Sequence, residues 1–113
     1  MSNRQRIVGD DEIDKALDWL RDSAQAIGDA KARMVKAGHM IKHIEAIETK
    51  LSNEASVAAR RVDALCSLRY LAAIDEDAAA TGEYQKLVAL REAATLRIDA
   101  WRTESSNYRS MKI

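Results

Sequence analysis

Two histidines four residues apart come closer to the spacing of a metal site than any other residues of this sequence. His39 and His43 would share one face of a helix, as two zinc-binding imidazoles do. The residues between them are Met40-Ile41-Lys42, so the glutamate that acts as general base in helical zinc proteases is absent. Lys36 and Lys42 bring positive charge close to the pair. We therefore expect two partly exposed histidines on a polar helix face, and no metal site.

Catalytic chemistry finds no other support in the sequence. Cys66 is the single cysteine and follows Leu65, which suits a small buried apolar group. The carboxylates of Asp75-Glu76-Asp77 are consecutive, so on a helix they fan out around the axis and do not converge. The sequence contains no Gly-rich phosphate loop, no Ser-His-Asp set and no dinucleotide fingerprint. We expect a protein that is not an enzyme, with no catalytic residue and no cofactor.

Basic side chains beside tryptophan are the pattern that points to binding. The stretch from Lys31 to His43 contains four basic residues and no acidic one, and three arginines or lysines near Trp101 add to them. Positive charge next to an aromatic ring suits single-stranded nucleic acid, because phosphate attraction and base stacking act together. Tryptophan is also enriched where proteins bind one another. The predicted partner-binding residues are Trp19, Lys31, Arg33, Lys36, Arg97, Trp101 and Arg102.

The composition predicts the elements that carry these residues. The 113 residues include 20 alanines, no proline and four glycines, and strong helix formers dominate. Alternating β-branched and aromatic residues are nowhere sustained, so we expect an all-α fold. Alanine buries little area, which favours a long, coiled-coil-like antiparallel hairpin over a globule. Eighteen basic and eighteen acidic residues give a net charge of zero, unlike a protein that depends mainly on phosphate contacts.

Apolar spacing predicts one helical domain over residues 10–106. Apolar residues recur in alternating steps of four and three along the first helix, at Ile13, Leu17, Leu20, Ala24 and Ile27. We predict a helix over 10–65, which could bend or break at Gly38 or at Ser52-Asn53, then a turn at 66–68 and a second helix over 68–106. Residues 1–9 are expected to form a flexible arm and 107–113 a frayed tail.

Two features of this hairpin stay open. Thr81-Gly82 could end one helix and start another, giving a three-helix bundle. If the chain instead turns once near Ser67, Trp101 lies level with Met34, and the two basic stretches form one band.

The two ends of the chain resemble a known family. DKALDWLRDSAQAIGDAKA (14–32) and LRIDAWRTESSNYRS (96–110) are similar to short helical proteins of temperate phages and prophages of Gram-negative bacteria. The family's genes often neighbour an Erf-type single-strand annealing protein. Where members carry a Pro-Tyr step, this chain has Arg69-Tyr70. The matching positions are Asp14, Ala16, Leu17, Asp18, Leu20, Arg21, Asp22, Arg97, Ile98, Ala100, Trp101 and Arg102.

The resemblance implies a setting in phage recombination. We predict an accessory protein that binds a protein partner or single-stranded DNA. The alternatives are an inhibitor of a host defence or repair nuclease, such as a CRISPR effector or an exonuclease, and a structural adaptor within the virion. Surplus apolar positions predict a homo-oligomer. A single cysteine and the absence of an apolar run of about 20 residues predict a protein of the bacterial cytoplasm without membrane contact.

Overall fold

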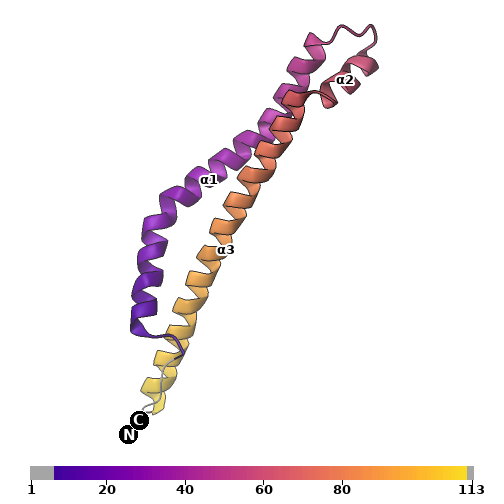
Figure 1. Ribbon diagram of the computed structural model, residues 1–113. Helices are drawn as coiled ribbons and strands as arrows, with labels where there is room; N and C mark the ends of the chain where they lie inside the picture. The colour runs from indigo at the N-terminus through magenta and orange to yellow at the C-terminus, as the bar shows by residue number, and fades with distance from the viewer. Residues whose placement is uncertain (1–6, 112–113) are drawn as a thin grey trace. The chain divides into compact units, whose positions relative to one another are not determined.

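Three helices and no strand make up the part of the chain that the computed structural model describes, residues 7–111 (Figure 1). They are α1 (Asp10–Leu51), α2 (Val57–Leu65) and α3 (Leu68–Met111). The all-α, hairpin-type fold predicted from the composition is confirmed. Contacts divide the chain into two compact units, to which α1 and α3 each contribute a segment. Unit 1 comprises Met1–Ala26 with Lys86–Ile113, and unit 2 comprises Ile27–Gln85.

Helix α1 begins where the acidic cluster predicts it. Asp10, Asp11 and Glu12 fill its first turn, where negative charge complements the helix dipole. The preceding residues pack within unit 1: Val8 is only 6% exposed, and the N–H of Ile7 donates to Glu104 Oε2 at 2.8 Å. The predicted flexible arm is therefore wrong for residues 7–9, and its residues 1–6 lie outside the described part.

The predicted helix over 10–65 is wrong in its length, because the chain leaves the helix after Leu51. Polar side chains around the break offer the backbone other hydrogen bonds. Ser52 Oγ accepts from the Glu54 N–H at 3.2 Å and donates to Asp63 Oδ2 at 2.7 Å. Ser56 then caps α2 by accepting from the Ala59 N–H at 3.0 Å.

The connection from α2 to α3 lies at the predicted turn. Ser67 Oγ donates to the carbonyl of Ala64 at 2.8 Å and accepts from the N–H of Tyr70 at 3.1 Å, which fixes the start of α3. Helix α3 then runs unbroken through Thr81-Gly82 and ends at Met111. A third helix starting at Gly82 is wrong, because the buried alanines on either side favour a continuous helix. The predicted frayed tail is wrong for 107–111, while 112–113 lie outside the described part.

Buried and half-buried residues together recur on α1 in alternating steps of three and four, which defines a seam of small and aliphatic side chains. In unit 1 the seam holds Ile13, Ala16 and Ser23, and in unit 2 it holds Ile27, Ala30, Ala37 and Ile44. Leu17 and Ala24, predicted for the seam, are exposed. Ala16 and Ser23 take their place because small side chains let helices approach closely. On α3, Ala80 in unit 2 and Ala94 in unit 1 are buried for the same reason.

Candidate partner-binding surfaces

Trp101 lies on the partly buried face of α3 in unit 1, and its position fixes the pairing of the helices there. The indole Nε1–H donates to Asp10 Oδ1 at 3.2 Å, across from the first turn of α1. Trp101 is thereby paired with the start of α1 within unit 1, whereas the sequence predicted that it would lie level with Met34, a residue of unit 2.

Arg33 forms the best-defined ion pair of unit 2. Its Nε and Nη2 donate to Glu76 Oε1 and Oε2 at 2.7 and 3.1 Å, linking α1 to α3 in bidentate fashion. The hydrogen bond from Arg33 lowers the pKa of the Glu76 carboxyl, and the same bond raises the pKa of Arg33. Arg33 is therefore paired with an acid within unit 2, and Trp101 is bonded to Asp10 within unit 1; the basic band, which would join residues of both units, stays a prediction.

The remaining predicted binding residues are dispersed over the two units. Trp19 is half-buried in unit 1, next to the seam residue Leu20. Lys31 and Lys36 are exposed on α1 in unit 2, and Arg97 and Arg102 are exposed on α3 in unit 1. These side chains still provide binding groups, but the described contacts do not assemble them into one site.

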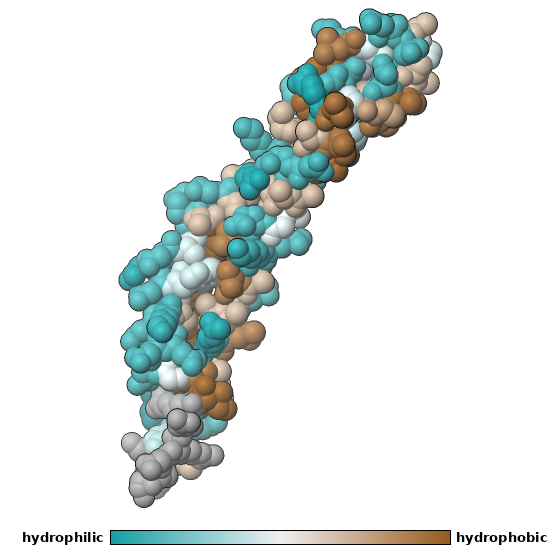
Figure 2. All heavy atoms as spheres, in the orientation of Figure 1, coloured by the Kyte–Doolittle hydropathy of each residue, from teal (hydrophilic) through white to brown (hydrophobic). Residues whose placement is uncertain are grey.

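A different surface gathers apolar side chains around α2. Of the fifteen large apolar side chains exposed in the described part, seven lie between residues 51 and 74, all within unit 2. Their exposed fractions run from 41% to 84%. Figure 2 shows brown, hydrophobic side chains in the region of α2. We name these seven residues the apolar end cluster: Leu51, Val57, Val62, Leu65, Leu68, Leu71 and Ile74.

Both α2 and the first turns of α3 present apolar faces to solvent. On α2, Val62 and Leu65 point away from the buried Ala64. On α3, Leu71 and Ile74 are exposed, whereas their neighbours Tyr70 and Ala73 are partly buried. Because α3 is continuous from Leu68 onward, these side chains are held on a helical scaffold rather than on a loop.

Polar side chains near the cluster are tied to groups of the same unit. Arg61 Nε contacts Glu45 Oε1 at 3.1 Å, and Arg69 Nε lies 3.5 Å from Glu48 Oε1. The Nε–H of Arg60 donates to the carbonyl of Glu54 at 2.6 Å. These contacts pair the charges with groups of the same unit, while the Arg61 and Arg69 side chains stay 70% and 56% exposed beside the aliphatic groups.

Comparison with known proteins adds no relative: no family model, no curated protein and no solved structure matches the chain. The surfaces must therefore be interpreted from their own chemistry.

Metal chemistry has no assembled ligand set in the described part. No group of three or more His, Cys, Asp or Glu side chains within residues 7–111 is placed to hold a metal ion. His39 and His43 are both exposed on α1. They line an open hollow together with Ala32, Val35, Lys36 and Met40. Among the described helices, none is long and apolar enough to cross a membrane.

Part of the apolar end cluster can be found in the sequence as an apolar repeat at the start of the second predicted helix. Leu71, Ile74 and Ala78 repeat in steps of three and four, which is also the spacing of a hairpin seam. The structure places the partly buried face one residue earlier, at Tyr70, Ala73 and Asp77. Two apolar patterns on one helix therefore mark two faces: one faces the hairpin and the other faces solvent.

Proposed function

We propose that this protein is a non-catalytic helical binding protein, whose main contact with another protein is the apolar end cluster. The observation that supports this is the concentration of seven exposed aliphatic side chains in 24 residues around α2. Isolated apolar residues are normal on protein surfaces, whereas a contiguous group marks a site of interaction. The partner would present an apolar helix of its own, since aliphatic helix faces pack best against each other.

The strength of such a contact can be gauged from the side chains involved. Completing the burial of one partly exposed Val, Leu or Ile contributes about 1 kcal/mol, so the cluster provides on the order of 7 kcal/mol before the costs of association. Those costs are on the order of 4–15 kcal/mol. At the low end of that range the cluster leaves only about 3 kcal/mol, so a stable complex needs added contacts from the partner.

Single-stranded DNA is less well supported as a ligand. Base stacking needs an accessible aromatic face next to free cations. Trp101 is partly buried and bonded to Asp10, and Arg33 is engaged by Glu76. Neither group offers what the predicted band required, and Arg97 and Arg102 supply charge without an exposed tryptophan at their level.

The resemblance to phage recombination proteins suggests where to look for the partner. We propose that the protein acts as an accessory factor in the bacterial host cell, with the neighbouring annealing protein as the first candidate to test. Self-association into a homo-oligomer is a further part of the proposal, because the chain exposes more apolar surface than the hairpin itself can cover.

The experiment compares partner capture by three versions of the tagged full-length chain in its native host. Leu65→Glu/Leu68→Glu places two charges in the apolar end cluster, while Leu96→Glu changes an equally exposed leucine of α3 in unit 1. We expect the wild type and Leu96→Glu to capture the same partner protein in similar amounts. The amount captured by the double variant should be at least tenfold lower. Circular dichroism checks that each variant stays helical. A wild-type chain that enriches no protein over the double variant would refute the proposed contact.

A further inference from the structure

His39 and His43 border one open hollow on the outward face of α1 in unit 2. Both side chains are exposed. Residues four apart on a helix share a face, with Cβ atoms about 6 Å apart, so the two imidazole rings lie over the same space. We name this surface the histidine hollow, and its other lining residues are Ala32, Val35, Lys36 and Met40.

The backbone that carries the two histidines is held in place within unit 2. Ala37 and Ile44 flank the pair in sequence and are 4% and 8% exposed, so the opposite side of α1 is packed. Before the pair, Arg33 is bonded to Glu76 of α3 at 2.7 and 3.1 Å. Both histidines also lie well inside α1, away from its ends. The spacing of the two rings is therefore set before any ligand arrives.

Both rings are available to a ligand. Among residues 7–111, no hydrogen bond or ion pair engages either imidazole. A neutral imidazole offers one nitrogen to a metal ion. Two such nitrogens one helical turn apart can bind the same ion, as the two histidines of helical zinc sites do. The glutamate that this sequence lacks between them acts in catalysis by zinc proteases, and binding alone does not need it.

The charges around the histidine hollow are mixed. Lys36 lines it and Lys42 precedes His43, and both oppose an incoming cation. Their ammonium groups end flexible four-carbon stems on exposed side chains, so they can turn into solvent. The nearby carboxylate of Asp77 approaches α1 at Gly38, with Oδ1 3.8 Å from the position that a Cβ would take there. Binding in the hollow must therefore come from nitrogen coordination rather than from attraction between opposite charges.

This ligand chemistry selects the metal. Imidazole suits zinc, nickel and copper, and the affinity of a given site rises to a maximum at Cu²⁺. Zinc sites use three or four protein ligands. No group of three or more His, Cys, Asp or Glu side chains in the described part is placed to supply them. Cu²⁺ accepts a square arrangement, in which two imidazoles take neighbouring positions and water takes the others.

We propose that the histidine hollow is a copper site, in which His39 and His43 bind one Cu²⁺ ion across a turn of α1. Met40 lines the same hollow, but its thioether is a soft ligand that prefers Cu⁺ and adds little to the binding of Cu²⁺. This inference does not depend on the apolar end cluster, on unit 1 or on any partner protein.

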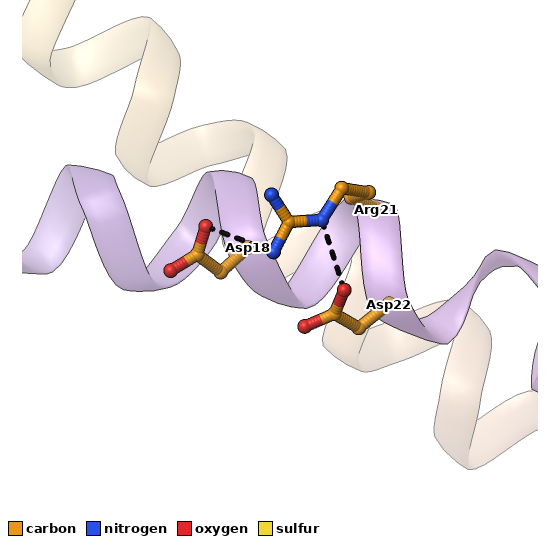
Figure 3. A network of polar contacts seen from close by, with 3 residues as sticks. All are labelled: Asp18, Arg21 and Asp22. Carbon is orange, nitrogen blue, oxygen red and sulfur yellow. Dashed lines mark hydrogen bonds and ion pairs between the residues drawn. The ribbon is translucent and has the colours of Figure 1, made fainter.

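The start of α1 in unit 1 carries a different group of possible ligands. Asp11, Asp14, Asp18 and Asp22 are exposed there. Arg21 contacts Asp22 Oδ1 at 2.9 Å and Asp18 Oδ1 at 3.3 Å, so two of these four carboxylates already face a cation (Figure 3). Carboxylates are hard ligands that suit Mg²⁺ and Ca²⁺. Cu²⁺ should therefore prefer the imidazoles, and Asp18→Asn should leave its affinity unchanged.

Titration calorimetry of the full chain with Cu²⁺ tests the site. Every protein in the series carries Cys66→Ser, because the exposed thiol would compete for the metal. We expect the parent of the series to bind one Cu²⁺ ion per chain. The affinity should be at least tenfold lower in His39→Ala and in His43→Ala, since each leaves a single imidazole. Met40→Leu should bind Cu²⁺ as the parent does.

The matched control is His39→Lys/Lys42→His, which keeps the composition and the net charge of the chain. It places the two imidazoles on consecutive residues, which point about 100° apart on a helix. We expect its affinity to fall as far as that of the single variants. Electron paramagnetic resonance gives a second readout, because the parent complex should show two nitrogen ligands and the control should show at most one.

Three results would overturn the proposal. The first is a parent chain that does not bind Cu²⁺, and the second is equal binding by His39→Ala/His43→Ala and the parent. The third is a matched control that binds as tightly as the parent. Circular dichroism checks that each variant remains helical. Partner capture through Leu65 and Leu68 would be unaffected by any of these results, which separates this inference from the proposed function.

Discussion

Ser23 is the one polar residue among the buried residues of the described part, and its hydroxyl is costly. The residue is 9% exposed, and its Oγ has no hydrogen-bond partner among the described residues. Removing an unsatisfied buried hydroxyl recovers its desolvation cost, and alanine is the better helix former. Ser23→Ala should therefore raise the free energy of unfolding by about 1 kcal/mol.

Urea denaturation of the purified chain checks this expectation. The reciprocal change Ala30→Ser places a hydroxyl at an equivalent buried position of α1 in unit 2, and it should lower the midpoint by a similar amount. A Ser23→Ala variant with an unchanged or lower midpoint would show that the hydroxyl contributes to stability.

Glu76 gives the chain a defined response to acid. Its carboxyl has a lowered pKa in the folded state because of the hydrogen bond from Arg33. Because the pKa is lower in the folded state, the ionised carboxyl stabilises the fold at pH values above the ordinary glutamate pKa of about 4.3. This stabilisation is lost as the pH falls through the pKa that Glu76 has in the folded state. Glu76→Gln should lower the urea midpoint slightly at pH 7, and the difference should vanish at acid pH.

The matched control is Glu92→Gln, which changes an exposed glutamate of α3 that has no ion pair with an arginine of α1 among the described residues. Its midpoint should follow the wild type at both pH values. If Glu76→Gln differs from the wild type equally at pH 7 and below pH 3, the contact with Arg33 is not the cause.

Helix α2 is short enough to depend on its cap. It has nine residues, fewer than the roughly 12 that an isolated helix needs. Ser56 supplies the capping hydrogen bond to Ala59, and Ala64 supplies the buried contact. Ser56→Ala should cost about 1 kcal/mol of local stability, while Ser56→Asp keeps a good cap.

Hydrogen exchange reports the effect on this element directly. The amides of Ala59 and the residues after it should exchange several-fold faster in Ser56→Ala than in Ser56→Asp. Amides of α1 in unit 1 serve as the internal reference. Equal exchange in the two variants would mean that packing, rather than the cap, holds α2.

At the level of elements, the sequence predicts the helices better than their faces. The acidic residues at Asp10 mark the start of α1, and Ser67 marks the start of α3. The seam is harder to assign, since Ile13, Leu20 and Ile27 fit with either Ala16 and Ser23 or Leu17 and Ala24. Only the approach of the second helix decides between them, and it buries Ala16 and Ser23.

The pairing of the helices could not be predicted because it depends on the length of the connection. Ser52 and Ser56 remove residues 52–56 from the helix through side-chain hydrogen bonds, and the spacing of apolar residues does not reveal these. When the turn moves along the chain, each residue of α1 faces a different residue of α3.

On the scale of the whole molecule, the proposed self-association predicts a stability that depends on concentration. If the folded chain self-associates, a tenfold rise in concentration stabilises each dimer by about 1.4 kcal/mol, or about 0.7 kcal/mol per chain. The melting temperature should then rise by about 3–5 °C per tenfold concentration. Calorimetry from 5 to 500 µM measures this. A constant melting temperature over that range would indicate a monomer.

Labelling of Cys66 can measure whether a partner occupies the apolar end cluster. It is the sole cysteine of the chain, it is exposed, and it caps the C-terminus of α2 between Leu65 and Leu68. A maleimide reagent will therefore attach at one known place without any engineered mutation. Its rate of attachment will fall when a bound protein shields the thiol, and a fluorophore fixed there will change its emission as the surrounding leucines lose water.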